Sequence, residues 1–182
     1  MMRKEQALEA YLIAGAQSGE WAAKERLVRL RGPRLLAHAT RLLGERELAR
    51  DVVQTAWIDI FAGLAGLRDP AAFLPWALRI VSRKVAAEIA RRQKTRAFLH
   101  EYAEAQDLSV EPLGEQHADA QAVRRAIDQL PAPMRAAIAL FYLDDLSVAE
   151  VAMALDVPQG TVKTRLMHAR ERLRWALQGD SK

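Results

Sequence analysis

The amino-acid sequence predicts an all-α protein made of two small helical domains joined by an acidic, flexible linker. Apolar residues recur at the three- and four-residue spacing of amphipathic helices, and no segment alternates apolar and polar residues as a strand would. Glycine and proline stand mainly between these periodic segments. The third observation is a change of composition in the middle of the chain, where basic residues are absent.

Helices are expected in order along the chain, with ends set by the turn-forming residues between the periodic segments. Before the acidic stretch they are expected at about residues 4–18, 21–43, 45–67 and 70–94. After it they are expected at about residues 118–129, 132–142, 148–155 and 158–178. The third helix carries a long apolar stripe, which is typical of a helix packed against a core. That stripe comprises Val53, Trp57, Ile60, Leu64 and Leu67.

The acidic stretch divides the chain into two domains. Residues 97–121 contain no lysine or arginine, and their acidic residues are Glu101, Glu104, Asp107, Glu111, Glu115 and Asp119. The net charge is −6 over these 25 residues. Because Pro112 and Gly114 break helices, the composition indicates a flexible linker. We therefore predict a first domain at residues 1–96, a linker at 97–117 and a second domain at 118–182.

The formal net charge of +4 is modest, but the basic residues are concentrated on either side of the linker. Those just before it are Arg79, Arg83, Lys84, Arg91, Arg92, Lys94 and Arg96, against one acid, Glu88. Those in the final helix are Lys163, Arg165, Arg170, Arg172 and Arg174, against Glu171. Such concentration favours a polyanionic partner, and the alternative for either run alone is a solvated helix face.

The composition excludes several kinds of site. The chain has no cysteine, which excludes disulfides, thiolate metal sites and cysteine nucleophiles. The four histidines are too scattered to predict a metal cluster, and no catalytic motif joins a nucleophile to a base. We therefore expect no metal, no cofactor and no catalytic residue. No segment has the apolar length of a signal peptide core or a membrane span, which favours a cytoplasmic protein without membrane insertion.

Residues 146–174 have the pattern of a helix-turn-helix. Ser147 and Glu150 form a capping box at the start of a short first helix. Asp156 tolerates the left-handed conformation that a tight turn needs, and Pro158 suits the first turn of the next helix. Two helices joined by three or four residues are the consequence.

The apolar stripe of the final helix determines which side chains face outward. The stripe comprises Val162, Leu166, Ala169 and Leu173. The candidate DNA contacts outside it or on its flanks are Gln159, Thr161, Lys163, Thr164, Arg165, Met167, His168 and Arg172. The first turns of such a helix can enter the major groove, where Gln, Lys and Thr bond base edges and flanking arginines bond phosphates. The alternative is an ordinary αα-hairpin with a charged outer face, in which Met167 and His168 are simply exposed.

The stretch AIDQLPAPMRAAIALFYLDDLSVAEVAMALDVPQGTVKTRLMHARERLR resembles region 4 of the sigma-70 family of bacterial RNA polymerase subunits, and in particular its extracytoplasmic-function group. The matching residues are Leu130, Pro131, Arg135, Leu140, Tyr142, Leu146, Ser147 and the run from Gly160 to Arg165. The resemblance implies that the final helix reads the −35 promoter element and that this domain binds the β flap of the polymerase. Asp156 replaces a glycine common in the family's turn, at little expected cost.

The resemblance extends upstream, in the family's order, over most of the chain outside the linker and the termini. ELARDVVQTAWIDIF resembles region 2.2, and FLPWALRIVSRKVAAEIARRQ resembles regions 2.3 and 2.4. By this similarity, Asp51 and Gln54 match the family's Asp-x-x-Gln, which docks on the clamp coiled coil of the polymerase β′ subunit. From the residues alone, a solvated helix face is the alternative. Thr55 stands where relatives often have glutamate.

The helix expected at residues 70–94 has aromatic residues early and basic residues later, a mixture that suits single-strand capture. The candidate contacts to the −10 element are Trp76, Arg79, Arg83, Lys84, Arg91 and Arg92. Phe73 and Trp76 have a second interpretation, as core residues. In the family, the preceding loop, here about residues 63–72, forms the pocket for a flipped base. Arg83 and Ala87 depart from the Asn and the Asp or Asn of many relatives, so −10 contacts are expected to differ.

The function implied is that of a dissociable sigma factor, which directs core RNA polymerase to promoters with −10 and −35 elements. Its expected partners are the β′ clamp and β flap of core polymerase, promoter DNA, and an anti-sigma protein that wedges between the two domains. A monomer is favoured. The alternative is a stand-alone helix-turn-helix regulator, which predicts duplex binding without polymerase. An enzyme would need a converging catalytic set, and none is visible in the sequence.

Overall fold

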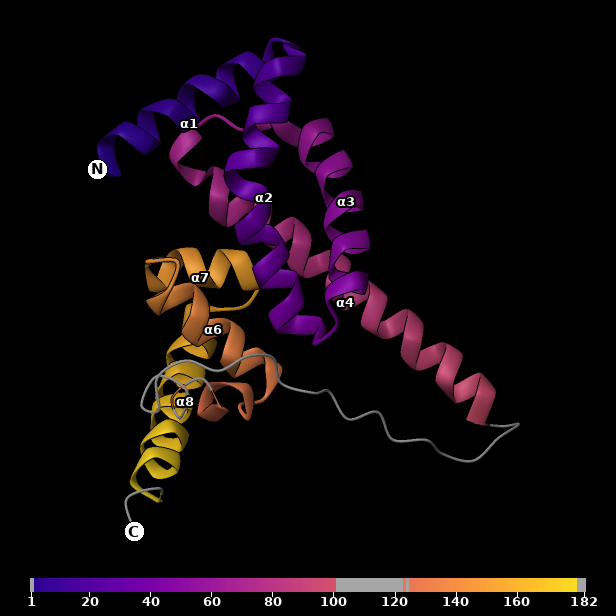
Figure 1. The fold of residues 1–182 in the computed structure, drawn as a ribbon, viewed down its shortest axis with the longest axis vertical. Helices are drawn as coiled ribbons and strands as arrows, with labels where there is room; N and C mark the ends of the chain where they lie inside the picture. Colours follow the sequence, from indigo (N-terminus) through magenta and orange to yellow (C-terminus); the bar gives the residue numbers. More distant parts are fainter. Residues whose placement is uncertain (1, 101–122, 124, 180–182) are drawn as a thin grey trace. The chain divides into compact units, whose positions relative to one another are not determined.

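The computed structural model describes residues 2–100, 123 and 125–179 of the chain. These residues form helices and no strand, so the all-α prediction is confirmed (Figure 1). They make two compact units, one built mainly from residues up to Ala86 and the other mainly from residues after it. The predicted linker from residue 101 onward lies outside the described residues, as does the beginning of the helix expected at 118–129. Residues 125–128 of that helix are helical.

The first unit contains α1 (Met2–Gln17), α2 (Trp21–Leu43) and α3 (Arg46–Gly63). Two single 3-10 turns, η1 (Leu64–Gly66) and η2 (Pro70–Ala72), then lead to α4 (Phe73–His100), which belongs to the first unit as far as Ala86. The four helices expected here are confirmed, with differences at two ends. α3 stops at Gly63 and does not continue to residue 67, because glycines at 63 and 66 weaken the helix. α4 continues past residue 94 to His100, so residues 97–100, predicted as the start of the linker, are helical.

Glycines shape the ends of the first two helices. Gly19, in the turn after α1, has a φ of 96°, and Gly44, at the end of α2, has a φ of 76°. A β-carbon is strained in this left-handed region, so glycine is the residue that fits. The Gly44 amide also donates to the carbonyl oxygen of Thr40 at 2.8 Å, which satisfies a carbonyl group that the end of the helix would leave unpaired.

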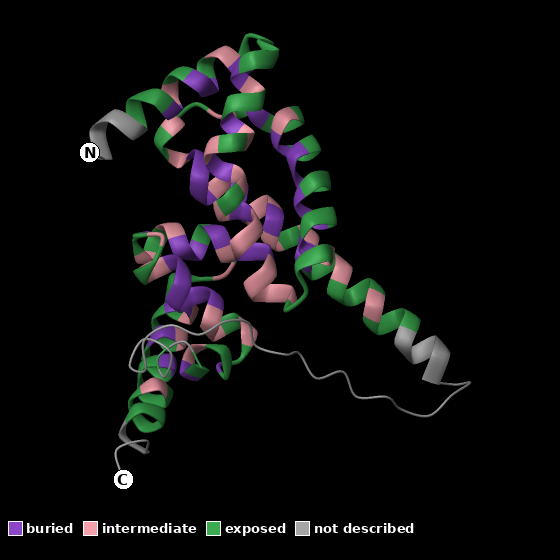
Figure 2. Cartoon of the chain, viewed as in Figure 1, coloured by how far each residue is buried: buried purple, intermediate pink, exposed green. Residues whose placement is uncertain are grey.

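The core of the first unit is formed by the apolar faces of its helices (Figure 2). The predicted stripe is confirmed for Val53, Trp57, Ile60 and Leu64, which are buried, whereas Leu67 lies beyond the end of α3 and is half-buried. Phe73, for which the sequence left both a core and a DNA-binding role open, is completely buried and is therefore a core residue. Burial of one such large side chain stabilises a protein by about 1.5–3 kcal/mol.

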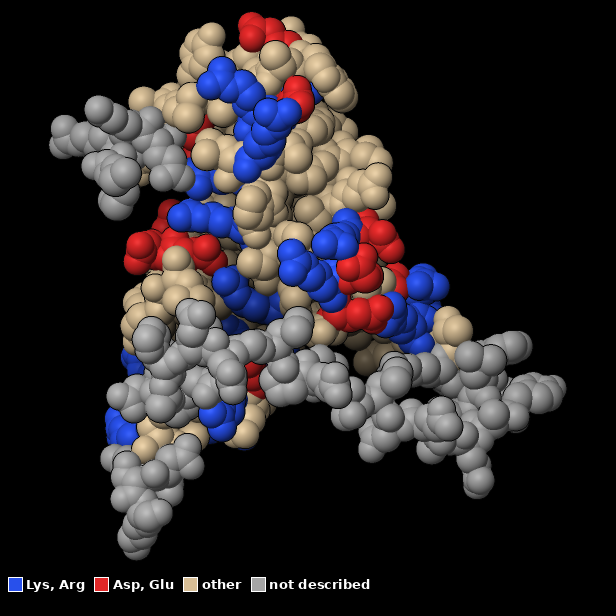
Figure 3. Space-filling view, viewed as in Figure 1, with Lys and Arg blue, Asp and Glu red and all other residues tan. Residues whose placement is uncertain are grey.

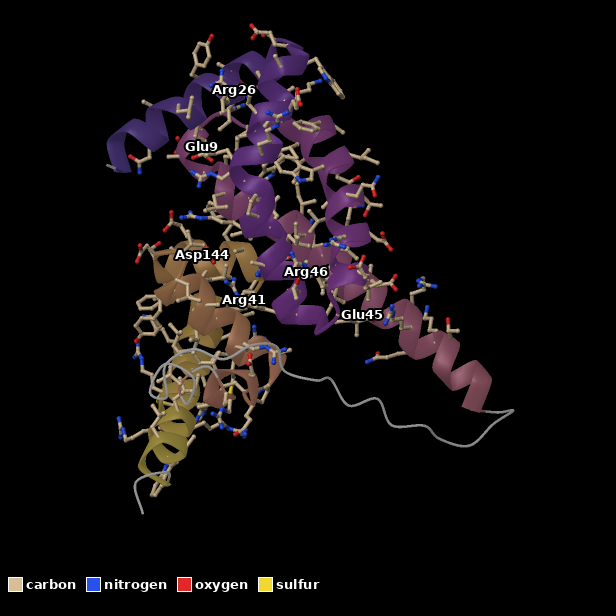
Figure 4. The ribbon with its side chains drawn as sticks, viewed as in Figure 1. Glu9, Arg26, Arg41, Glu45, Arg46 and Asp144 are labelled. Atoms are coloured by element: carbon tan, nitrogen blue, oxygen red, sulfur yellow. The ribbon has the colours of Figure 1, made fainter. Side chains whose placement is uncertain are left out.

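A buried ion pair and a close helix approach hold α1 against α2. Glu9, labelled on α1 in Figure 4, accepts hydrogen bonds from Arg31 on α2, at 2.6 Å from Nε and 2.7 Å from Nη2. Both side chains are buried. A β-carbon at Gly15 would lie 2.9 Å from the β-carbon of Ala23, closer than two such atoms can pack. Glycine at position 15 therefore permits this approach, and α1 has a fixed position on α2.

The second unit contains α6 (Ala132–Tyr142), α7 (Val148–Leu155) and α8 (Gln159–Gly179). The predicted capping box is confirmed: the Ser147 amide donates to Oε2 of Glu150 at 2.7 Å, and the Glu150 amide donates to Oγ of Ser147 at 3.3 Å. Asp156, between α7 and α8, has a φ of 54°, which confirms the left-handed turn. The helix-turn-helix therefore starts and turns where the sequence predicts.

Candidate functional site

The start of α8 presents a polar face on the side away from a buried apolar stripe. Val162, Leu166 and Ala169 are buried and Leu173 is half-buried, which confirms the predicted stripe. This stripe packs α8 against α6. Because the packing fixes how α8 is rotated about its axis, it also determines which side chains point outward.

Most of the candidate −35 contacts lie on that outward face. The exposed ones are Gln159, Lys163, Thr164, Met167, His168 and Arg172, and the half-buried ones are Thr161 and Arg165. Oγ1 of Thr164 donates to the carbonyl oxygen of Gly160 at 3.0 Å, and Nδ1 of His168 lies 3.3 Å from Oε2 of Glu171. The face thus brings an amide, an ammonium and a hydroxyl group together, and these groups bond base edges and phosphates.

Arg170 is turned toward α6. Its Nε donates to the hydroxyl oxygen of Tyr142 at 2.9 Å, and its guanidinium carbon lies 5.7 Å from the Tyr142 ring centre and 6.0 Å from that of Phe141. The sequence grouped this arginine with the phosphate-binding residues of the final helix. Its contacts with two aromatic rings give it a packing role in the second unit.

Among the candidate −10 residues, Lys84, Arg91 and Arg92 are paired with carboxylates of α3 and α4. Nζ of Lys84 lies 2.7 Å from Oδ2 of Asp59 on α3. Arg91 and Arg92 share Glu88, with distances of 2.7 Å and 3.1 Å to its Oε1. These bonds, first that from Arg91 and then that from Arg92, lower the pKa of the Glu88 carboxyl to about 2, so Glu88 is ionised at neutral pH. Basic and acidic side chains also adjoin on the face shown in Figure 3.

The remaining −10 candidates are distributed between the core boundary and solvent. Trp76 and Arg79 are half-buried, and Arg83 is exposed. The Trp76 ring centre lies 6.1 Å from that of Phe73, so part of the indole packs on the core. Trp76 therefore has the core-packing role that the sequence left open. Contact of its remaining surface with a base of the −10 element stays a prediction.

The loop between α3 and α4 is held from α1, a contact that sequence reasoning missed. Nε2 of Gln17 donates to the carbonyl oxygens of Leu64 and Leu67, both at 2.9 Å. No local pattern signals this bond, because Gln17 lies 47 and 50 residues before its partners. Gly63, the last residue of α3 before the loop, lies against Trp76. A β-carbon at this position would be 3.1 Å from Cζ2 of the indole.

The outer face of α3 carries the candidate polymerase contacts. Asp51 and Gln54 are both exposed, on the face opposite the buried Trp57 stripe. Ile58 follows Gln54 by one helical turn and is 67% exposed. Sequence reasoning did not select Ile58, although its position outside the apolar stripe was a usable signal.

Two kinds of feature are absent from the part of the chain that the structure describes. No group of three or more histidine, aspartate or glutamate side chains there is arranged to hold a metal ion. None of the helices formed by those residues combines the length and the hydropathy needed for a membrane crossing.

Family models match both units of the chain. Residues 27–95 match the family described as sigma-70 region 2, and residues 120–173 match sigma-70 region 4. The first match includes α3, the loop and most of α4, and the second includes α6, α7 and most of α8. The three candidate surfaces, on α3, α4 and α8, therefore lie inside matched segments, whereas α1 lies outside them.

Whole-length relatives agree with these matches. The ECF RNA polymerase sigma factor SigM of Mycobacterium tuberculosis is 34% identical over 169 residues, covering 91% of this chain and 82% of SigM. The ECF RNA polymerase sigma-E factor of Escherichia coli is 31% identical over 183 residues, covering 92% and 93%. The sigma factor RpoE of Bartonella quintana, solved with the anti-sigma factor NepR, has a similar fold, with a TM-score of 0.69, 23% identity and coverage of 85% and 96%. The chain belongs to the extracytoplasmic-function group of the sigma-70 family of RNA polymerase sigma factors.

Proposed function

We propose that this sigma factor binds core RNA polymerase through α3, opens the −10 element with α4 and its preceding loop, and reads the −35 element with α8. The observation that carries the proposal is the exposed polar face at the start of α8, opposite its buried stripe. Sigma factors of this group are transcription initiation factors that direct core polymerase to promoters. The proposal assigns parts of that activity to particular surfaces.

The −35 element is read by the first two turns of α8. Gln159, Lys163 and Thr164 are exposed on these turns, and their side chains can bond base edges in the major groove. Arg172 lies two turns further along and is placed to bond a phosphate, which fixes the position of the helix without reading sequence. Specificity and affinity are thereby divided between the two ends of the helix.

The −10 element is opened by binding energy and needs no catalytic group. Unstacking a base costs a few kcal/mol, which contacts to the extruded base and to phosphates offset. Arg83 is exposed and would make such phosphate contacts after exchanging its bond to Asp156, whose Oδ2 lies 2.8 Å from its Nε. Trp76 beside the loop offers an aromatic surface for a base. Arg91 and Arg92 would contribute after rearranging their bonds to Glu88.

The outer face of α3 binds the β′ clamp of core polymerase. Asp51 and Gln54 supply a charge and an amide, and Ile58 adds an exposed apolar side chain to the same face. A small apolar centre with a polar rim is the usual composition of a protein interface. Binding of the β flap by the second unit follows from family resemblance alone.

An anti-sigma protein is the proposed inhibitor, and the cytoplasm is the proposed location. The Bartonella relative was solved in complex with an anti-sigma factor. An inhibitor of this kind would cover the surfaces that bind polymerase and DNA.

The test of the proposed function is co-elution of the purified full chain with bacterial core RNA polymerase, followed by run-off transcription from a promoter library. Co-elution with initiation from a subset of promoters is the expected result, and the selected fragments would reveal the −10 and −35 sequences. Binding to duplex DNA without any association with polymerase would instead support a stand-alone regulator.

Substitutions on α8 are expected to separate base reading from phosphate binding. Lys163→Ala or Thr164→Ala should lower initiation from promoters with the matched −35 element by about tenfold, because a base contact is lost. Arg172→Ala should lower affinity to a similar extent on matched and scrambled elements, because its partner is a phosphate. The measurement is run-off transcription and holoenzyme binding on both templates. Equal losses for Lys163→Ala on the two templates would remove that residue from base recognition.

Asp51→Ala combined with Gln54→Ala is expected to weaken core polymerase binding by about 10- to 100-fold, as removal of central interface contacts does. The fold should be unaffected because both side chains are exposed. The affinity of the labelled chain for core polymerase provides the measurement, with Glu25→Ala on α2 as an exposed carboxylate control. Unchanged affinity in the double variant would place the polymerase interface elsewhere.

A further inference from the structure

The loop of residues 64–72 makes several hydrogen bonds of its own. The Leu67 amide donates to the carbonyl oxygen of Leu64 at 3.0 Å, and Oδ1 of Asp69 accepts from the Ala71 amide at 2.9 Å. These bonds define its two short turns. The first turn follows α3 directly and the Leu64 side chain is buried, whereas these bonds do not tie the carbonyl groups of residues 64–67 to another helix.

Gln17 supplies such a contact. Its side-chain amide Nε2 donates to the carbonyl oxygens of Leu64 and Leu67 at 2.9 Å each, so one group spans both ends of the first turn. One donor group thereby limits how far the two carbonyl groups can separate or rotate. Figure 1 shows the connection between α3 and α4 passing beside α1.

The position of Gln17 is itself well determined. It is the last residue of α1, and α1 is fixed to α2 by the buried Glu9–Arg31 pair and by the close approach at Gly15. α2 thus fixes the position of α1, and Gln17 at the end of α1 fixes the carbonyl oxygens of the loop. α1, which carries Glu9, Gly15 and Gln17, precedes residue 27, where the region 2 match begins.

The loop also borders the aromatic side chain that is proposed to receive a base. The backbone at Gly63 lies so close to Trp76 that an added β-carbon would be 3.1 Å from its Cζ2. A change in the path of residues 63–67 would therefore alter the space beside the indole. Leu64, whose carbonyl oxygen accepts one of the Gln17 bonds, directly follows Gly63. The Gln17 bonds therefore influence the position of the Gly63 backbone beside the indole.

We infer that Gln17 is a positioning residue for promoter opening, which holds residues 64–67 in the conformation that accepts an unstacked base of the −10 element. The inference rests on the proposed function of the loop. Without the two bonds, the loop would populate other conformations, and base capture would first require selection of the competent one. Loss of two hydrogen bonds is expected to slow open-complex formation by roughly tenfold.

The test uses the holoenzyme assembled from the full chain and core polymerase. The rate of open-complex formation is measured on a promoter selected by the library experiment, and on versions with a single abasic site at each −10 position of the non-template strand. The variants are Gln17→Ala and Gln17→Glu, the second of which keeps the length but removes the donor. Gln6→Ala, an exposed glutamine earlier on α1, is the matched control.

The expected result is that both Gln17 variants slow opening of the intact promoter, whereas Gln6→Ala behaves as the unmodified chain. On the promoter that lacks the captured base, the Gln17 variants and the unmodified chain should open at the same rate, because no pocket is used. Equal slowing by Gln17→Ala on intact and abasic promoters would overturn the inference, since it would indicate a general effect on folding or polymerase binding. Unchanged opening by Gln17→Ala would overturn it as well.

Failure of the proposed function has a different signature. If no abasic site in the −10 element affects the unmodified chain, base capture does not occur in this loop, and the role of Gln17 is overturned together with it. One abasic site could slow opening by the unmodified chain while Gln17→Ala opens the intact promoter at the unmodified rate. In that case the proposed function stands and only the Gln17 inference fails.

Discussion

Glu9→Ala is expected to lower the free energy of unfolding by about 3–5 kcal/mol, because it leaves the charge of Arg31 buried without the carboxylate that accepts its two hydrogen bonds. Both side chains are less than one tenth exposed, at 8% for Glu9 and 6% for Arg31. The buried guanidinium would have to be rehydrated, or α1 would have to separate from α2. The measurement is urea denaturation of the full chain, followed by circular dichroism.

Glu25→Ala is the control for the Glu9 experiment. Glu25 pairs with Arg29, four residues later on α2, at 2.6 Å. The two side chains are 50% and 76% exposed, respectively. Exposed pairs of this kind contribute at most a few tenths of a kcal/mol, so Glu25→Ala should have little effect. Replacing Glu9 and Arg31 together with methionine should restore much of the stability, because both charges of the buried pair are removed. Equal small effects of Glu9→Ala and Glu25→Ala would contradict this account.

Acid is expected to destabilise the protein through His38 at a pH where most carboxylates are still ionised. Burial first, and the nearby charge of Arg41 second, lower the pKa of the His38 imidazole from 6.5 to about 3. Nε2 of His38 lies 2.8 Å from Oγ of Ser82, whereas Nδ1 is buried and has no hydrogen-bond partner. A proton added at Nδ1 would therefore be a buried donor without an acceptor.

The direction of the pH effect follows from proton uptake in the two states. Well above pH 6.5, His38 is neutral in both the folded and the unfolded chain and contributes no pH dependence. Between pH 6.5 and 3, the unfolded chain binds a proton that the folded chain excludes, so stability falls as the pH falls. The expected loss is about 1.4 kcal/mol per pH unit, or about 2–3 kcal/mol between pH 6.5 and 4.5.

His38→Gln is the variant that tests this pH dependence. Glutamine does not titrate, so the free energy of unfolding should vary much less between pH 6.5 and 4.5, whatever its absolute value. His168→Gln, at an exposed position on α8, should keep the pH dependence of the unmodified chain. Urea denaturation at a series of pH values provides the measurement. An unchanged slope in His38→Gln would assign the acid sensitivity to other groups.

Local signals predicted most of the fold. The capping box at Ser147, the turn at Asp156 and the apolar stripes of α3 and α8 each depend on residues within one or two helical turns. Such patterns determine which face of a helix is buried, and the structure confirms them. For the same reason, the exposed face of α8 was predictable, although the roles of its side chains in DNA binding stay predictions.

Contacts between distant segments were not predictable, because periodicity does not specify where two helices cross. The Gln17 bonds to the α3–α4 loop and the Glu9–Arg31 pair both depend on such crossings. The pairing of Lys84 with Asp59 has the same origin. The sequence analysis counted Arg91 and Arg92 as independent positive charges on α4, although their pairing was predictable. Glu88 precedes them by three and four residues, the spacing at which helical side chains meet.

The shared carboxylate at Glu88 has a consequence for counterions. A protein that neutralises DNA phosphates releases the cations condensed on them, and the number released determines how steeply affinity falls with salt. Glu88 with Arg91 and Arg92 carries a single net positive charge, so this group displaces fewer cations than two independent arginines would. Strand binding along α4 would therefore be less sensitive to ionic strength than its content of basic residues suggests.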